Sequence, residues 1–203
     1  MLFHGLDFLI YSSHKTGTQT LKTSLKSKYK VYMIHLLRDL STIWRTNVTR
    51  EHVVWSLQQY KRIHGQPLKI ITVIRDHEER LVSSFFQTFH DDPIIDYKVD
   101  PMTTTVMTKT PEELVDLFVT HKESLPYFRE SLDELQEIDS TLYDLYTLDF
   151  TRIGDLEYIN RTLGTSLDRL VVENQTKDKV YKEKFEVFQK CVRDTLTSNE
   201  DKK

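Results

Sequence analysis

The sequence predicts an α/β fold in which helices flank a central parallel sheet. Short apolar runs alternate with helical patterns through the first half of the 203-residue chain, as they do in successive βαβ units. These runs are continuous rather than alternating, which is typical of strands buried on both faces of a parallel sheet. The length suits one domain and no linker or repeat divides the chain, so we expect a single domain over residues 1–203.

Three strands and three helices are expected in the first half. The strand signals cover residues 6–11, 31–37 and 69–76, and the last of them, KIITVIRD, is the strongest in the chain. Helical periodicity follows each strand, since apolar residues recur three and four positions apart on one face. The three helices are expected over residues 18–28, over residues 51–62 and from His77 onward.

The second half has a more irregular pattern. Residues 91–109 are polar, with two prolines and a threonine cluster, and are expected to form a surface loop or lid. A helix should begin at Pro111, because Thr110 suits the N-cap and Glu113 stands three residues after it. We further expect a helix over 125–138, a strand over 141–150, a helix over 155–163 ending at Gly164, a helix over 181–196 and a frayed tail over 198–203.

Composition narrows the classes of function. The chain has 28 basic and 31 acidic residues and a formal net charge of −3, so no broad positive field is available to hold nucleic acid. No run approaches the roughly 20 apolar residues that a membrane-spanning helix needs. One cysteine excludes an internal disulfide framework and a cysteine-based zinc site, and the eight histidines are scattered. We therefore expect a cytoplasmic protein without a metal, a membrane span or a nucleic-acid partner.

The first candidate site is the segment SSHKTGTQTL, residues 12–21, which follows the first strand. A strand that runs through a polar turn into a helix presents unpaired N–H groups and the positive end of the helix dipole to an anion. Gly17 lets the backbone approach closely, threonine hydroxyls donate, and Lys15 adds a positive charge. The order is not that of a Walker A loop, because Lys15 precedes the glycine. The alternative is an ordinary turn with a solvated lysine.

The second candidate site is at the end of the third strand, where Arg75 precedes Ser83 by eight residues. In open α/β sheets, ligands bind outside the carboxyl ends of the strands, so Lys15 and Arg75 should lie on one edge of the sheet. Arg75, as a two-pronged donor, and Ser83 would then hold a second phosphate. The alternative is that Arg75 forms a surface salt bridge and Ser83 is only a small helix residue.

The two loops resemble the cofactor loops of sulfotransferases that use 3′-phosphoadenosine 5′-phosphosulfate. In that family a Lys-[Ser/Thr]-Gly-[Thr/Gly]-x-[Ser/Thr] loop binds the 5′-phosphosulfate, and HKTGTQTL resembles it. The family's Arg-Asp-Pro-x-x-Arg-x-x-Ser motif, which binds the 3′-phosphate, is matched by RDHEERLVS, with His77 in place of proline and Arg80 at the second arginine. The resemblance assigns cofactor binding to Lys15, Thr16, Gly17, Thr18, Gln19, Thr20, Arg75 and Ser83.

This resemblance also implies a fold and a reaction. It implies a P-loop-like sulfotransferase fold and transfer of a sulfonate group to a hydroxyl of a carbohydrate or small-molecule acceptor, with no metal. Residues 146–164 resemble the family's later strand and helix. Residues 173–185 are similar to a C-terminal signature of a bacterial branch of capsular polysaccharide synthesis proteins, with Asn174, Lys179 and Tyr181 as the matching positions and Val180 and Lys182 as departures.

Sulfonate transfer needs charge stabilisation and a base. Lys15 is the expected group beside the leaving oxygen. His35 is the candidate base, because it lies near the end of the second strand, which opens on the same edge of the sheet, and an ordinary imidazole accepts a proton near neutral pH. The alternative for His35 is a buried structural role, and His52, His64 and Glu51 are the fallback bases.

Two other classes of function stay open at this point. One is a phosphate-handling P-loop enzyme such as a small kinase, for which Asp76 would be the candidate magnesium ligand, although the Walker A order is absent. The other is a nucleotide-binding module without catalysis, because a fold does not fix a function.

Overall fold

The computed structural model describes residues 2–13, 16–91, 110–121, 132–171 and 182–200. The chain divides into two compact units, and both are discontinuous in sequence. The first contains Met1–Arg75 and Arg129–Asn174, and the second contains Asp76–Phe128 and Gln175–Lys203. The expectation of one domain over 1–203 stays a prediction.

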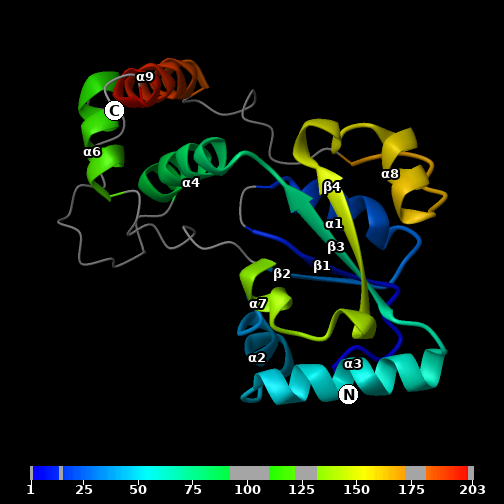
Figure 1. Cartoon of the computed structure of the whole chain (residues 1–203). Coiled ribbons are helices and arrows are strands. Elements are labelled where there is room, and N and C mark those ends of the chain that lie inside the picture. Colours follow the sequence, from blue (N-terminus) through cyan, green and yellow to red (C-terminus); the bar gives the residue numbers. More distant parts are fainter. Residues whose placement is uncertain (1, 14–15, 92–109, 122–131, 172–181, 201–203) are drawn as a thin grey trace. The chain divides into compact units, whose positions relative to one another are not determined.

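The first unit contains a four-stranded, all-parallel sheet in the order β2-β1-β3-β4 (Figure 1). Its strands are β1 (Phe8–Tyr11), β2 (Val31–Ile34), β3 (Leu68–Ile74) and β4 (Tyr143–Asp149). β3 and β4 pair along their whole length, whereas β1 and β3 pair only from Phe8↔Lys69 to Ile10↔Ile71. The predicted α/β class with a central parallel sheet is confirmed.

Helices cover both faces of this sheet. On one face, α1 (Thr18–Lys26) and α8 (Leu156–Leu163) pack against strand residues that include Phe8 and Ile10. On the other face, α3 (Arg50–His64), α2 (Asp39–Trp44) and α7 (Leu132–Gln136) pack in a core that includes Leu9 and Tyr11. Because successive strand side chains point to opposite faces, β1 must be apolar at every position, as its sequence is.

Short-range signals determine where several of these helices begin and end. The side chain of Asp155 accepts from the Tyr158 backbone N–H at 2.9 Å and caps α8, which ends at Gly164 in the left-handed conformation, as predicted. Helix α2 was not predicted, because its six residues bury only Leu40 and are too few to show a period. Of the helix expected over 125–138, α7 confirms the last part, and residues 122–131 lie outside the described ranges.

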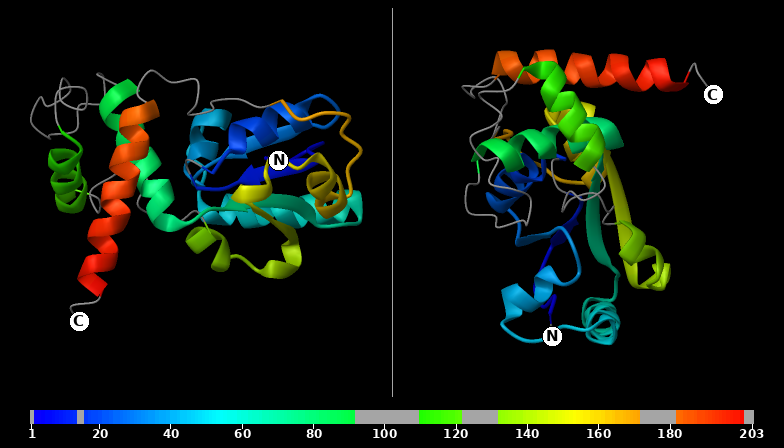
Figure 2. Two further views of the ribbon diagram at one scale, coloured as in Figure 1. Left: turned by 90° about the horizontal axis from the view of Figure 1, so that it is seen from above. Right: turned by 90° about the vertical axis from the view of Figure 1, so that its left-hand side faces the viewer.

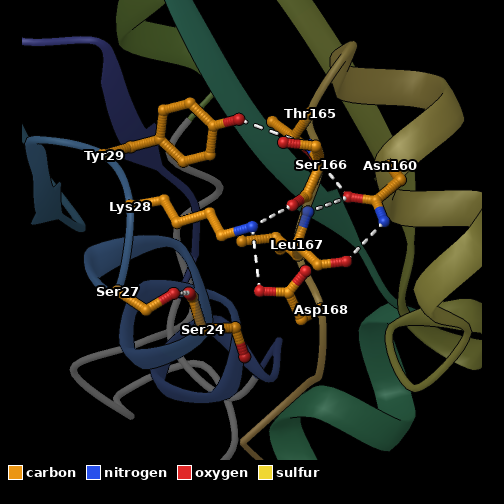
Figure 3. A network of polar contacts seen from close by, with 9 residues as sticks. All are labelled: Ser24, Ser27, Lys28, Tyr29, Asn160, Thr165, Ser166, Leu167 and Asp168. Atoms are coloured by element: carbon orange, nitrogen blue, oxygen red, sulfur yellow. Dashed lines mark hydrogen bonds and ion pairs between the residues drawn. The ribbon is translucent and has the colours of Figure 1, made fainter.

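A polar network ties the segment after α8 to the C-terminal end of α1 (Figure 3). Lys28 donates to the carbonyl of Ser166 at 2.6 Å and forms an ion pair with Asp168 at 2.9 Å. From α8, the side-chain carbonyl of Asn160 accepts from the Leu167 backbone N–H at 2.8 Å, and its amide donates to the Leu167 carbonyl at 2.9 Å. The side chains of Lys28 and Asn160 thus hold this segment from two helices.

The segment continues along α1, and we call residues 165–171 the strap. The backbone N–H of Val171 donates to Ser24 Oγ at 2.9 Å, and that hydroxyl donates to the carbonyl of Thr20 at 2.7 Å. Thr20 belongs to the first turn of α1. The strap therefore runs from the C-terminal end of α1 toward the end that follows the predicted anion-binding loop.

The described part of the second unit contains three helices, α4 (His77–Asp91), α6 (Pro111–His121) and α9 (Lys182–Glu200). α6 and α9 pack side by side, with α4 against α9 (Figure 2), around an apolar core that includes Phe85, Phe118 and Phe188. The predicted capping box at the start of α6 is confirmed, since the Thr110 and Glu113 side chains each bind the other's backbone N–H.

The expected tail over 198–203 and the expected lid over 91–109 each overlap the end of a helix in this unit. The frayed tail expected over 198–203 stays a prediction; helix α9 runs to Glu200, and neither glycine nor proline interrupts the sequence before that point. Residues 201–203 lie outside the described ranges. The lid expected over 91–109 begins with Asp91, the last residue of α4, and its other residues also lie outside these ranges.

Candidate functional site

The strand order places a topological switch point between β1 and β3. From β1 the chain crosses to β2 on one side, and from β3 it continues to β4 on the other, which is the arrangement that opens a crevice at the carboxyl ends of the strands. Backbone pairing of β1 with β3 stops at Ile10↔Ile71. Beyond it, Ser12 Oγ accepts from the Val73 N–H at 3.0 Å and lies 3.1 Å from the Val73 carbonyl oxygen. A serine hydroxyl thus joins the strands where they begin to separate.

The loop after β1 is held by its own hydroxyl groups. Thr16 Oγ1 donates to the Ser13 carbonyl at 2.7 Å and lies 2.9 Å from Ser12 Oγ. The side chains of Ser12 and Thr16 are buried. The hydroxyl of Thr16, expected to contact an anion, is therefore used to shape the loop, which leaves the backbone as the part of Thr16 that suits a ligand.

Gly17 is the N-cap of α1 and adopts the left-handed conformation, with φ of 73°. It brings no side chain to the first N–H groups of the helix, and the first turn carries no acidic residue. These N–H groups and the positive end of the helix dipole therefore favour an external anion. In that first turn Thr18 and Thr20 are buried, whereas Gln19 is exposed.

The space beside Gly17 is filled by an aromatic ring from the segment after β4. A Cβ atom at Gly17 would lie 3.2 Å from Phe150 Cε2 and 3.5 Å from Ile153 Cγ2. Phe150 is the first residue of η3 (Phe150–Arg152), a 3-10 helix of one turn. The turn after β1 thus needs glycine both for its backbone conformation and for the approach of this ring.

Gly17→Ala is expected to destabilise the protein more than Gly65→Ala does. Both glycines have a φ near +70°, but a Cβ at Gly65 would meet nothing within 4 Å. Both variants should lose about 1–2 kcal/mol from the left-handed backbone, and Gly17→Ala should lose roughly 1 kcal/mol more from crowding against Phe150. Urea unfolding of the two variants measures the difference, and equal losses would contradict the close packing of Phe150 against the turn.

Arg75 is placed at the same edge by the end of β3. Its guanidinium carbon lies 4.2 Å from the centroid of the Phe150 ring, within the range of a cation–π interaction. The same ring adjoins Gly17. The structure therefore brings together two predicted site residues, Gly17 and Arg75, through an aromatic side chain between them.

His35 follows β2 and lies beside the loop after β1. Its Nδ1 is 2.7 Å from the Ser12 carbonyl oxygen. The carboxylate of Asp39 accepts from the backbone N–H groups of both His35, at 2.8 Å, and Leu36, at 3.0 Å. A carbonyl oxygen can only accept, so Nδ1 must carry the proton it donates, and the lone pair of a neutral ring is then on Nε2.

A second carboxylate extends this control of the backbone after β2. Glu134, on α7, accepts from the Leu37 N–H at 2.7 Å and from the Tyr11 hydroxyl at 2.5 Å. Tyr11 is the last residue of β1 and is buried. Since Asp39 binds the two preceding N–H groups, carboxylates bind the three consecutive N–H groups of residues 35–37. These bonds hold the backbone at His35, and the Ser12 carbonyl holds its ring.

The environment lowers the pKa of His35 from its usual value of 6.5. Burial is the largest cause, because it penalises the charged imidazolium, and the positive charge of Lys22 acts in the same direction. The hydrogen bond to the Ser12 carbonyl and the charge of Asp39 oppose the shift without cancelling it. His35 is therefore neutral at pH 7, as a proton acceptor must be.

Several predicted site residues lie elsewhere. Lys15 is outside the described ranges, and Ser83 lies on α4 in the second unit, so its pairing with Arg75 stays a prediction. Arg80 is buried in that unit, with Nη2 3.0 Å from His77 Nδ1. The histidine in place of the family's proline therefore contacts the motif's second arginine.

The fallback bases have local structural roles. His52 completes the capping box at the start of α3, where its Nδ1 accepts from the Thr49 N–H at 3.2 Å. His64 ends α3 and lies against the Tyr60 ring at 4.3 Å between centroids. Glu51 is exposed, and a hydrogen bond from Thr49 lowers its pKa. None of these contacts points to catalysis, whereas His35 contacts the loop after β1.

Three residues of this edge were not singled out from the sequence: Phe150, Asp39 and Glu134. Asp39 starts a helix four residues after His35, and an acidic residue at such a position is a recognisable signal for a helix start. Phe150 and Glu134 reach the edge from more than 50 residues beyond Arg75, and no local pattern marks them. Long-range pairing of this kind is visible only in the fold.

The described ranges contain neither a cluster of metal-ligating side chains nor a membrane-spanning helix. Within them, no group of three or more His, Cys, Asp or Glu side chains is arranged to hold a metal ion. None of the helices in the same ranges is long and apolar enough to cross a bilayer.

No protein-family model, curated protein or solved structure matches the chain. The interpretation of function therefore depends on the residues at the carboxyl edge of the sheet and on the resemblance of their motifs.

Proposed function

We propose that the chain is a sulfotransferase of P-loop-like fold. It would transfer a sulfonate group from 3′-phosphoadenosine 5′-phosphosulfate to a hydroxyl of a carbohydrate or small molecule. The observation that carries the proposal is the juxtaposition of Gly17 and Arg75 at the switch point of a parallel sheet. A donor with phosphates at both ends needs two separate anion-binding elements, and these come from two adjacent strands.

The residues at this edge fit such a donor. The start of α1 has no capping side chain and no acidic residue, so its N–H groups suit the 5′-phosphosulfate. The guanidinium of Arg75 suits the 3′-phosphate, which it would bind as a two-pronged donor. When bound, the donor supplies an activated sulfonate whose S–O bond to the bridging phosphate oxygen breaks as the acceptor oxygen bonds to sulfur.

The chain's own residues then have distinct tasks. Nε2 of His35 takes the proton from the acceptor hydroxyl, since Nδ1 is engaged by the Ser12 carbonyl. Lys15, with the N-terminus of α1, stabilises negative charge on the departing oxygen. Asp39 and Glu134 keep the backbone around His35 in place, so that little reorganisation accompanies proton transfer.

A ligand screen followed by turnover tests the proposal. Adenosine 3′,5′-bisphosphate at 100 times its dissociation constant should stabilise the protein by about 2.7 kcal/mol without a metal. ADP and ATP should stabilise it less. Preference for magnesium–ATP would instead indicate a kinase-like enzyme. Tight binding of the bisphosphate without sulfonate transfer to any hydroxyl of an acceptor panel would indicate a binding module.

Arg75→Ala is expected to weaken binding of adenosine 3′,5′-bisphosphate by about 1.5–3 kcal/mol, the scale of a charge-assisted hydrogen bond. Binding of adenosine 5′-monophosphate, which lacks the 3′-phosphate, should change little. Calorimetric titration with both nucleotides measures the effect. Arg152→Ala is the matched control, because Arg152 also stacks on a ring, that of Tyr158 at 3.9 Å. Equal losses for both nucleotides would show that Arg75 does not read the 3′-phosphate.

A further inference from the structure

We propose that Phe150 is a positioning residue that holds the Arg75 guanidinium at the anion-binding edge. The inference rests on the proposed function, because it gives Arg75 a phosphate to bind. Phe150 is half-buried and belongs to the core that α1 and α8 form with the sheet. The ring is therefore anchored by packing, while the arginine side chain that lies over it has many rotamers.

Two contacts define the position of the ring. The Arg75 guanidinium carbon lies 4.2 Å from its centroid, and Cε2 lies 3.2 Å from the place where a Cβ of Gly17 would be. The Phe150 ring therefore lies between the Arg75 guanidinium and the Gly17 turn and sets the distance between them. An aromatic face attracts a guanidinium without using its N–H donors, so the contact with the ring does not compete with a phosphate.

The arrangement has a functional consequence for ligand choice. A flexible arginine binds any nearby anion, whereas one held at a set distance from the α1 N-terminus favours a ligand whose two anionic groups match that distance. Phe150 should therefore determine how strongly the protein prefers a nucleotide with both phosphates. It would act through Arg75 and need not touch the ligand.

The test measures the preference for adenosine 3′,5′-bisphosphate over adenosine 5′-monophosphate by calorimetry. In the unmodified protein Arg75 should produce a preference of roughly 10- to 150-fold. Phe150→Leu, which keeps an apolar side chain, should reduce this preference about 3- to 10-fold, within the range of a cation–π contact. Phe150→Tyr, which keeps the ring, should restore it. Tyr146→Leu is the matched control, since Tyr146 packs on the same core under Lys69 at 6.0 Å.

A double-mutant cycle separates positioning from general packing. Adding Phe150→Leu to Arg75→Ala should leave the nucleotide preference as it is in Arg75→Ala alone, because the two changes remove one effect. If Phe150→Leu weakens both nucleotides equally, the ring acts on their common part or on stability, and the inference is overturned. If the unmodified protein binds neither nucleotide, the proposed function fails and this role fails with it. If the preference exists but is unchanged in Phe150→Leu, only the positioning role fails.

Thermal unfolding shows whether a loss of nucleotide preference comes from a folding defect. Phe150→Leu and Tyr146→Leu should melt within a few degrees of each other, since each removes one half-buried ring from the same core. Should Phe150→Leu fail to fold, the comparison passes to Phe150→Met, which keeps more of the apolar volume and also lacks the ring. The same loss of preference is then expected, and its absence would overturn the inference.

Discussion

Replacing His35 with alanine is expected to lower turnover by about 10²- to 10⁴-fold, the usual contribution of a general base. Binding of adenosine 3′,5′-bisphosphate should change little, because Nδ1 of His35 binds the Ser12 carbonyl, which precedes the helix N-terminus that is expected to hold the phosphate. Steady-state rates and calorimetry on the same preparations separate the two quantities. His64→Ala, which removes an exposed histidine stacked on Tyr60, is the control and should keep full activity.

The pH profile gives a second measure of the same role. The base is the neutral ring, so kcat/KM should rise with pH as His35 loses its proton. Because burial lowers the pKa of His35, the midpoint of this rise should lie below 6.5. His35→Asn keeps a donor for the Ser12 carbonyl but offers no base, and in this variant the rising limb should vanish. A folded His35→Asn protein with an unchanged rate and profile would mean that the base lies elsewhere.

Lys15→Ala is expected to lower turnover by about 10²- to 10³-fold, as the loss of one preorganised electrostatic partner does. Thr16, which follows Lys15, donates to the Ser13 carbonyl and directly precedes Gly17, the N-cap of α1. Affinity for the unreacted donor should fall less than turnover, because the negative charge on the departing oxygen is greater in the transition state than in the bound donor.

Lys26→Ala provides the control for Lys15→Ala. Lys26 is exposed in the last turn of the same helix, so its loss changes the net charge equally but acts at the opposite end of α1. Single-turnover measurement with a fixed acceptor distinguishes the chemical step from product release. A Lys15→Ala protein that forms the sulfated product at the normal rate would contradict this role.

The parallel sheet was predictable because strands that are buried on both faces consist almost entirely of apolar residues. Apolar runs without alternation marked β1 and β3, and the Asp155 cap with Gly164 marked both ends of α8. The second strand was predicted too long, over 31–37. It ends at Ile34 because the N–H groups of His35 and Leu36 bind the Asp39 carboxylate instead of continuing in the strand, and side-chain competition of this kind is not visible in hydropathy.

Prediction of the candidate site was limited by sequence separation. The rule for parallel sheets predicted Lys15 and Arg75 at one edge; the structure places Gly17 and Arg75 on either side of the Phe150 ring, and Lys15 lies outside the described ranges. Phe150 and Glu134 could not be placed there, because each reaches that edge from a different part of the chain and neither carries a motif. Thr16 shows a second limit of sequence analysis. The motif placed Thr16 in the loop correctly, but it could not show that the Thr16 hydroxyl donates to the Ser13 carbonyl.

The discontinuity of the first unit affects how the nascent chain completes its sheet. β1, β2 and β3 are all synthesised by residue 74, but β4 and the strap follow only after the 53 residues of Asp76–Phe128. At about 5–20 residues per second, the ribosome needs roughly 4–15 s to pass from Arg75 to Asp149, the last residue of β4. During that interval the edge of β3 that pairs with β4 has no partner strand, and such an edge is a template for association with other chains. Production of the protein should therefore benefit from chaperones that shield this edge until β4 emerges.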